Sequence, residues 1–183
     1  TEELFCSAPL RRSSFPLANF RFSCYTKRMQ YDYKTLYEKH AAFYKKSPVR
    51  LKILKLVNTA CSWLFAVAYV GLLASAALSD KIPLQKVLPL FFAPALALFA
   101  VSAIRLGAER PRPYSSKGAH VTPLVSRGDR DGDSFPSRHL ACAAVIATVF
   151  CSVLPVTGAL LILCCFVLAY TRFAIGVHYP SDL

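Results

Sequence analysis

Two histidines in the last third of the chain have arginines close by and can take part in proton or group transfer. His139 directly follows Arg138, and His178 lies between Arg172 and Asp182. No Asp, Glu, Lys or Arg occurs between Arg138 and Arg172. Ionisable side chains at the mouth of an apolar segment are costly and are usually retained for function. Because an imidazole binds and releases protons near neutral pH, these residues are candidates for acid–base or nucleophilic chemistry.

Two further arginines lie upstream of the histidines. Arg105 ends an apolar segment, and Arg112 follows it by seven residues. On a continuing helix, this spacing would place both side chains on one face, about two turns apart. Guanidinium groups bind anions through paired N–H donors. Together with the histidines, they predict an anion-binding pocket at a membrane surface.

The composition favours an integral membrane protein of one compact unit. The 183 residues are 55% hydrophobic, the mean hydropathy is +0.39, and the formal net charge is +12. Such a charge suits either nucleic acid or a phosphate-bearing lipid surface. Because the basic residues bracket apolar runs, we favour the membrane and expect no nucleic-acid partner. The seven cysteines show no metal-ligand spacing, so we expect free buried thiols.

The apolar runs predict four membrane-spanning helices, at about 56–79, 87–105, 138–154 and 156–176. The first two runs are long enough to cross a hydrocarbon core of ~30 Å. The third run, from His139 to Thr171, would be ~50 Å long as one helix, so we expect Pro155 to divide it into a hairpin. Residues 29–51 mix aromatic with basic side chains, which is typical of an interfacial amphipathic helix with its aromatic residues against acyl chains.

This order of spans places all three charged clusters on one side of the membrane. The second span ends at Arg105, the third begins beside His139, and the hairpin returns the chain to Arg172 and His178. The basic N-terminal residues and the basic 105–138 loop favour a cytoplasmic face for this side. Arginines that bind phosphate would, however, be poor reporters of topology.

The two ends of the chain carry separate expectations. The only methionine is Met29, and residues 1–28 show neither helical periodicity nor a signal-peptide pattern. We therefore expect residues 1–28 to be a non-native or disordered segment. Residues 52–183 form the expected membrane domain, which ends at Leu183, one residue after Asp182.

The three motifs, in this order and spacing, resemble the signatures of the type 2 phosphatidic acid phosphatase family, whose superfamily includes vanadium haloperoxidases and soluble acid phosphatases. They are Arg105 with six residues before Arg112-Pro113, then Pro136-Ser137-Arg138-His139, then Thr171-Arg172 with His178 and Asp182. Three positions depart from the family pattern: Arg105 replaces Lys, Arg138 replaces Gly, and Thr171 replaces Ser.

The resemblance implies an all-α, multi-pass transmembrane bundle of the phosphatidic acid phosphatase/haloperoxidase type, with its last helix missing here. It implies that His178 is the nucleophile, oriented by Asp182, and that His139 is the general acid and base. The implied phosphate-binding residues are Arg105, Arg112, Ser137, Arg138 and Arg172. No metal or other cofactor is required, because the arginines supply positive charge.

The implied activity is metal-independent hydrolysis of a lipid phosphate or diphosphate, through a phosphohistidine, in the cell membrane. Candidate substrates by resemblance are phosphatidate, phosphatidylglycerophosphate and undecaprenyl diphosphate. A non-catalytic lipid-phosphate binder, a phosphotransferase and a haloperoxidase are alternatives, and the oligomeric state is left open. Six further charged residues of the long loop are expected to be solvated: Arg110, Arg127, Asp129, Arg130, Asp131 and Asp133.

Overall fold

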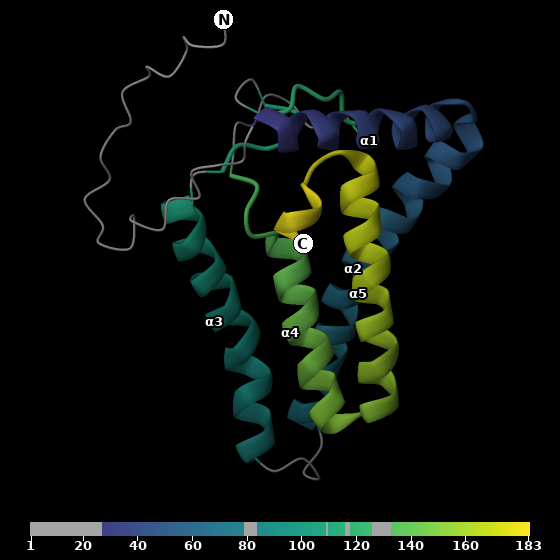
Figure 1. The fold of residues 1–183 in the computed structure, drawn as a ribbon. Helices are drawn as coiled ribbons and strands as arrows, with labels where there is room; N and C mark the ends of the chain where they lie inside the picture. Colours follow the sequence, from purple (N-terminus) through teal and green to yellow (C-terminus); the bar gives the residue numbers. More distant parts are fainter. Residues whose placement is uncertain (1–26, 79–83, 109, 116–117, 126–132) are drawn as a thin grey trace, which may run out of the picture.

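The computed structural model describes residues 27–78, 84–108, 110–115, 118–125 and 133–183, and these form a helical bundle (Figure 1). In chain order, the elements are α1 (Lys27–Lys45), α2 (Pro48–Leu78), α3 (Leu84–Ala108), α4 (Arg138–Val153), α5 (Pro155–Ile175) and a 3-10 turn (Pro180–Asp182). The expected all-helical, multi-pass architecture is confirmed. Residues 1–28 were expected to be a non-native or disordered segment. Of these, residues 1–26 lie outside the described residues.

Within the described part of the chain, three helices have the length and composition to cross a membrane. They lie at Pro48–Ala76, Phe91–Ala108 and Pro155–Ile175. Helix α4, the third of the four expected spans, has 16 residues. At ~1.5 Å per residue it is about 24 Å long, which is shorter than a hydrocarbon core. It packs against α2, α3 and α5, so it lies within the bundle that the longer helices form.

A tight hairpin joins α4 to α5 where Pro155 was expected to divide the apolar run. Helix α4 ends at Val153, and Pro155 occupies the first turn of α5. There, its missing N–H removes no helical hydrogen bond. Gly158 lets the two helices approach closely, since a Cβ atom at this position would lie 2.4 Å from the backbone nitrogen of Cys151. The hairpin returns α5 to the end of the bundle where α4 begins.

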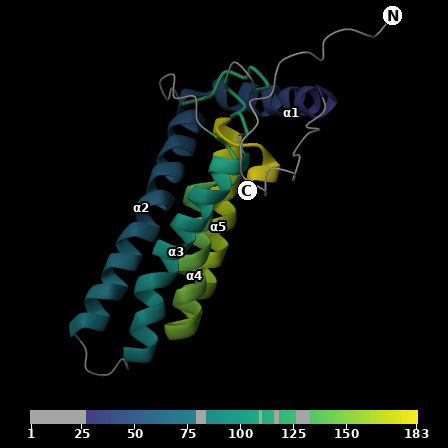
Figure 2. The same cartoon turned by 90° about the vertical axis from the view of Figure 1, so that its left-hand side faces the viewer.

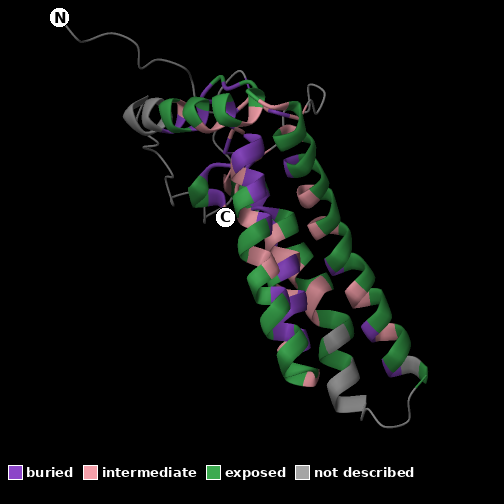
Figure 3. Ribbon diagram, turned by 90° about the vertical axis from the view of Figure 1, so that its right-hand side faces the viewer, coloured by how far each residue is buried: buried purple, intermediate pink, exposed green. Residues whose placement is uncertain are grey.

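The core between the long helices is formed by side chains of α2, α4 and α5 that face one another. Its buried members are Phe65, Leu72, Ala143, Ile146, Ala147, Val149, Phe150, Leu161 and Leu168. The outer faces of α2, α3 and α5 expose large apolar side chains, and exposed residues are green in Figure 3. An apolar exterior around a packed interior is the surface that a bilayer covers.

Helix α1 lies across one end of the bundle, transverse to the long helices (Figure 2). Its aromatic residues were expected to face acyl chains, and for two of them this expectation is wrong. Tyr33 and Tyr37 are only 6% and 1% exposed and pack against the segment that follows α5. The Tyr37 hydroxyl donates to the backbone oxygen of Ile175 at 3.2 Å and to that of Thr122 at 2.9 Å. Helix α1 is therefore part of the protein core at this end.

Candidate active site

The ends of α3, α4 and α5 meet at the end of the bundle that α1 covers. The Arg105 guanidinium, at the end of α3, donates to the backbone oxygen of Pro136 at 2.9 Å and also to that of Asp133. The Ser137 N–H, just before α4, donates to the backbone oxygen of Asp182 at 3.1 Å. These bonds bring the three motifs together at one end, as the order of the helices predicted.

His178 lies in a buried turn between α5 and the 3-10 turn, and its partner is Asp182. Gly176 ends α5 with a left-handed φ of 85°, a conformation that favours glycine, and reverses the chain direction. Pro180 then starts the turn that carries Asp182. The His178 Nδ1 lies 3.6 Å from the Asp182 Oδ2, and the two side chains are 4% and 0% exposed. The pair is thus enclosed, with Nδ1 directed at the carboxylate.

The environment of His178 favours its neutral form. Burial lowers the pKa of the imidazole below its usual value, because desolvation penalises the charged form. Asp182 opposes this effect and raises the pKa, while the charges of Arg112 and Arg172 lower it further. A neutral imidazole with one nitrogen facing a carboxylate is the form in which histidine can act as a nucleophile or base.

Arg112 is close to the other motifs, but not for the reason that its spacing suggested. Helix α3 ends at Ala108, so Arg105 and Arg112 do not share a helical face. Arg112 follows in an irregular segment that contains Pro111 and Pro113, which cannot continue a helix. It still interacts electrostatically with Arg105 and with His178. The loop, rather than a helix, brings this cation to the site.

Arg172 reaches the site from the last turn of α5. It is 2% exposed, and its Nη2 donates to the Ser62 hydroxyl on α2 at 2.9 Å. The neighbouring Thr171 hydroxyl approaches the Asn58 side-chain oxygen at 3.5 Å, also on α2. Two polar residues inside the first apolar run therefore orient the third motif.

The second motif forms the N-terminus of α4. Ser137 precedes the helix and is 2% exposed, and its Oγ has no hydrogen-bond partner among the described residues. Arg138 and His139 open the helix and are exposed. The first N–H groups of a helix lack intrahelical acceptors and favour an anion.

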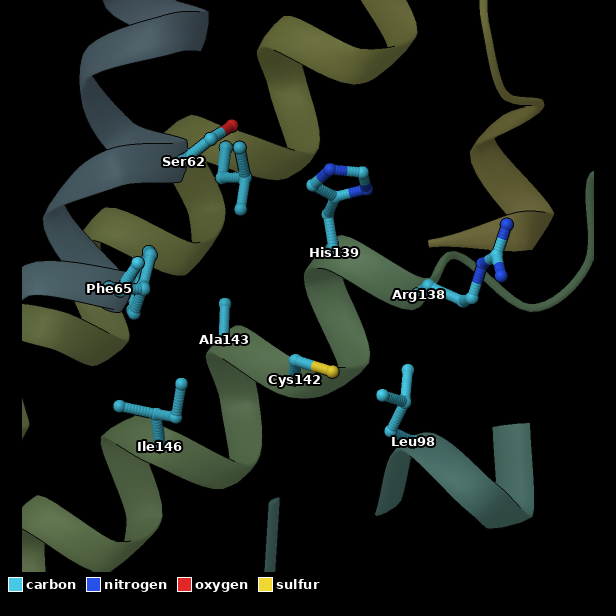
Figure 4. Close-up of a pocket in the computed structure, with 10 residues that line it drawn as sticks. Ser62, Phe65, Leu98, Arg138, His139, Cys142, Ala143 and Ile146 are labelled. Atoms are coloured by element: carbon cyan, nitrogen blue, oxygen red, sulfur yellow. The ribbon is translucent and has the colours of Figure 1, made fainter. Parts of the chain in front are cut away.

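A cavity of about 340 Å³ extends from the second motif into the bundle. Arg138 and His139 line its polar end, and side chains of all four long helices line the rest. Figure 4 shows the His139 ring at this end, with Phe65, Cys142, Ala143 and Ile146 along α2 and α4. The cavity therefore combines a basic mouth with an apolar interior.

One loop residue was assigned wrongly from the sequence. Arg110 was expected to be solvated, yet it is 7% exposed and its Nη1 lies 2.5 Å from the Asp182 Oδ1. Asp133, which shared this expectation, is partly buried and forms a β-bridge with Pro111. The expectations for Arg127, Asp129, Arg130 and Asp131 fall outside the described residues.

Sequence comparison places these motifs in a family. The sequence model of the PAP2 superfamily matches residues 86–183. The chain belongs to the PAP2 superfamily. This match covers nearly all of α3, all of α4 and α5, and all three motifs, and it confirms the resemblance that the motifs indicated.

A solved PAP2-type structure has a similar fold. A transmembrane PAP2-type phosphatidylglycerolphosphate phosphatase from Bacillus subtilis aligns with a TM-score of 0.64 and 18% identity, covering 86% of this chain and 78% of that one. Aquifex aeolicus LpxE aligns with a TM-score of 0.48 and 26% identity, over 72% and 84% of the two chains. A search of curated proteins finds no match. The chain is thus a membrane protein with the fold of a transmembrane PAP2 phosphatase.

Sequence reasoning missed several residues around the PAP2 motifs, although signals for them exist. Arg110 and Arg112 each precede a proline, and the repeated Arg-Pro pair indicates a stiff, extended segment rather than a solvated loop. Asn58 and Ser62 interrupt an apolar run, and polar residues in a span usually have a partner there. Tyr37 gives no such signal, because an aromatic residue beside lysines fits an interfacial position equally well.

Proposed function

We propose that this PAP2 protein hydrolyses a lipid phosphate or diphosphate, through a phosphohistidine on His178 and without a metal ion. The observation that carries the proposal is the enclosed His178–Asp182 pair beside Arg112 and Arg172. A site that only bound phosphate would need the arginines but no buried nucleophile with a carboxylate partner. The substrate class rests on family membership and on the apolar cavity.

In the first step, His178 attacks phosphorus. The carboxylate of Asp182 faces Nδ1 and favours the tautomer that carries its proton there, which leaves the lone pair on Nε2 for attack. A P–N bond forms as the P–O bond to the lipid breaks. His139, at the mouth of the cavity, donates its proton to the departing oxygen.

In the second step, water completes the hydrolysis. The now neutral His139 takes a proton from a water molecule as its oxygen attacks phosphorus. The P–N bond breaks, inorganic phosphate leaves, and His178 regains its lone pair. Each histidine has thus returned to its starting protonation state.

Positive charge stabilises the phosphoryl group as it is transferred. Arg112 and Arg172 lie close enough to lower the proton affinity of His178, so their charges also reach a phosphorus atom bound to it. We assign Arg105, Arg138 and Ser137 to the same anion. The buried Ser137 hydroxyl lacks a partner among the described residues and stands at the N-terminus of α4, which supports this role.

The cavity suits the lipid portion of the substrate. A phosphate held between Arg138 and His139 would lie at its polar end, and an acyl or prenyl chain would extend along Phe65 and Ile146. Burying such a chain is favourable by about 25 cal/mol per Å² of apolar surface. A water-soluble substrate would gain nothing from this apolar lining.

The test replaces His178 with glutamine and measures phosphate release from phosphatidate, phosphatidylglycerophosphate and undecaprenyl diphosphate in mixed micelles. We expect release by the wild type on at least one lipid and a loss of roughly 10³-fold or more in His178→Gln, since no nucleophile remains. Radiolabelled substrate should leave an acid-labile label on the wild type alone. His120→Asn, which changes an exposed histidine, should retain full activity.

Three results would contradict the proposal. Full activity in His178→Gln would exclude this residue as the nucleophile. A strict requirement for Mg²⁺, or complete inhibition by a chelator, would exclude the metal-free mechanism. A wild type that binds these lipids but releases no phosphate from any of them would favour a binder or carrier.

A further inference from the structure

Arg110 is held in place by bonds that its position in the sequence did not suggest. Its backbone oxygen accepts a hydrogen bond from the Ser134 N–H at 2.7 Å, and the adjacent Pro111 forms a bridge with Asp133. Its guanidinium lies with Cζ 4.7 Å from the centre of the Tyr179 ring, and Nη2 donates to the Ser181 hydroxyl at 2.9 Å. The backbone and the side chain are thus both fixed against the turn that carries Asp182.

The two carboxylate oxygens of Asp182 have different partners. Oδ1 pairs with Nη1 of Arg110 at 2.5 Å. Oδ2 accepts the Tyr179 N–H at 2.8 Å and faces His178 Nδ1 at 3.6 Å. Because Arg110 occupies Oδ1, the carboxylate plane cannot rotate without breaking a buried ion pair, which is strongly unfavourable. The arginine therefore fixes the oxygen that faces the histidine.

Arg110 also balances the charge of Asp182. Among the described residues, the charged groups that act on the His178 ring are Asp182 on its own turn, Arg112 from the loop and Arg172 from α5, while the Tyr33 hydroxyl from α1 donates to the His178 backbone oxygen. Asp182 is the only anion among these groups. Without Arg110, its uncompensated charge would hold a proton on the His178–Asp182 pair more tightly. A protonated His178 could not attack phosphorus.

We propose that Arg110 is a positioning residue, which orients and neutralises Asp182 so that His178 remains an unprotonated nucleophile. This inference rests on the proposed function, because it assigns a role within the same reaction. Arg110 differs in this respect from Arg112 and Arg172, which we place on the phosphate itself. It acts through the carboxylate and needs no contact with substrate.

The first test is Arg110→Gln, which removes the charge and retains much of the side-chain volume. We expect kcat to fall roughly 10- to 100-fold, because a small misplacement of a reacting group has costs of this size. KM should change less than about threefold, since the phosphate contacts remain. The acidic limb of the kcat/KM profile should move to higher pH, as the pair binds its proton more tightly.

The second test asks whether Arg110 acts through Asp182. In an Asp182→Asn background, Arg110→Gln should reduce kcat by less than about threefold, because the carboxylate it orients is gone. A reduction as large as in the wild-type background would show a general structural role and overturn the proposal. An unchanged kcat and pH profile in the single Arg110→Gln variant would overturn it as well.

Two further variants control for charge and folding. Arg50→Gln removes an arginine that also lies over an aromatic ring, Phe43 at 4.4 Å, and it should leave kcat and the pH profile unchanged. Arg110→Lys retains the charge, so it should keep the acidic limb within about 0.3 pH units of the wild type while kcat falls less than in Arg110→Gln. If Arg110→Gln does not fold, a shifted limb in Arg110→Lys would overturn the proposal.

A separate measurement distinguishes this inference from the proposed function. The histidine signals of ¹⁵N-labelled protein in micelles can be titrated by NMR, with His178→Gln used for assignment. Arg110→Gln should raise the titration midpoint of His178 whether or not the wild type hydrolyses a lipid. An inactive wild type would therefore end the proposed function, whereas an unmoved His178 midpoint would end the role of Arg110.

Discussion

Burial distinguishes the two histidines of this PAP2 protein. His178 is 3% exposed, whereas His139 is exposed at the mouth of the cavity. Desolvation keeps the first neutral, which suits a nucleophile, because a protonated imidazole has no lone pair to donate. Access to water suits the second, which must exchange a proton with the leaving group and then with water. The difference in burial thus supports different proposed roles for the two histidines.

The pH dependence of activity follows from the lowered pKa of His178. Attack requires the neutral imidazole, so kcat/KM falls as the pH drops through the folded-state pKa. Because burial lowers this pKa, the acidic limb should lie below ~6.5, the value for an exposed histidine. Asp182→Asn removes a carboxylate that raises the pKa of His178. The acidic limb of this variant should therefore lie at still lower pH, and its kcat should be reduced. The assay is phosphate release measured between about pH 4 and 9. An acidic limb of the wild-type profile above ~6.5 would contradict this prediction.

At the scale of elements, α1 and the turn after α5 behave as one packed unit. Tyr33 donates to the backbone oxygen of His178 at 3.4 Å, and its ring meets that of Tyr179 edge-on at 4.7 Å. Tyr37 lies against Gly176, where a Cβ atom would approach its ring carbon Cζ to 2.6 Å. Helix α1 therefore sets the position of the turn that holds the proposed nucleophile.

Gly176→Ala tests this coupling between elements. The left-handed φ costs alanine about 1–2 kcal/mol, and the contact with Tyr37 adds strain. We expect a lower melting temperature in micelles and a loss of phosphate release, because His178 lies two residues further on. The Cβ atom of Gly71→Ala would have no heavy atom within 4 Å. This variant should leave the melting temperature unchanged or slightly raised and should leave phosphate release unchanged. Equal behaviour of the two variants would contradict the coupling.

The sequence predicts the bundle better than it predicts the loops between the helices. Hydropathy and Pro155 located the α4–α5 hairpin, because burial of apolar side chains dictates that element locally. Helix α3 ended before Arg112, because Pro111 and Pro113 outweigh the seven-residue spacing. Arg110 was misassigned since its partner, Asp182, is 72 residues away, and no local pattern reports such a pair. Long-range polar contacts, rather than periodicity, complete this site.

At the scale of the whole molecule, the bundle offers two apolar environments to a lipid. The outer surface carries exposed side chains such as Val67 and Phe99, whereas the cavity lies between the four long helices and reaches His139. A lipid bound only by the outer surface would leave its phosphate away from His139. The interior cavity joins the apolar and basic regions, so we expect substrate selectivity to depend on it.

Ala66→Phe tests this expectation by narrowing the cavity. KM for a long-chain lipid phosphate should rise about tenfold or more, because an apolar pocket discriminates strongly by size. KM for a soluble aryl phosphate, which does not need the apolar interior, should remain within about twofold. Val67→Phe, at the next position but not among the residues that line the cavity, should affect neither substrate. An equal rise in KM for both substrates in Ala66→Phe would instead indicate a general distortion of the protein.

The hydrogen bond between Tyr33 and His178 spans 145 residues of chain, and this separation has a consequence for biosynthesis. Helix α1 leaves the ribosome first among the described elements, yet its tyrosines find their packing partners only after α5 has been made. Contacts this distant in sequence form late, because a long loop must close before any contact is gained. Until then, the tyrosines of α1 have only the start of α2 to pack against, and the headgroup layer is the environment that can accommodate their remaining surface. The site is therefore completed in one of the last folding events, once the spans are already in the bilayer.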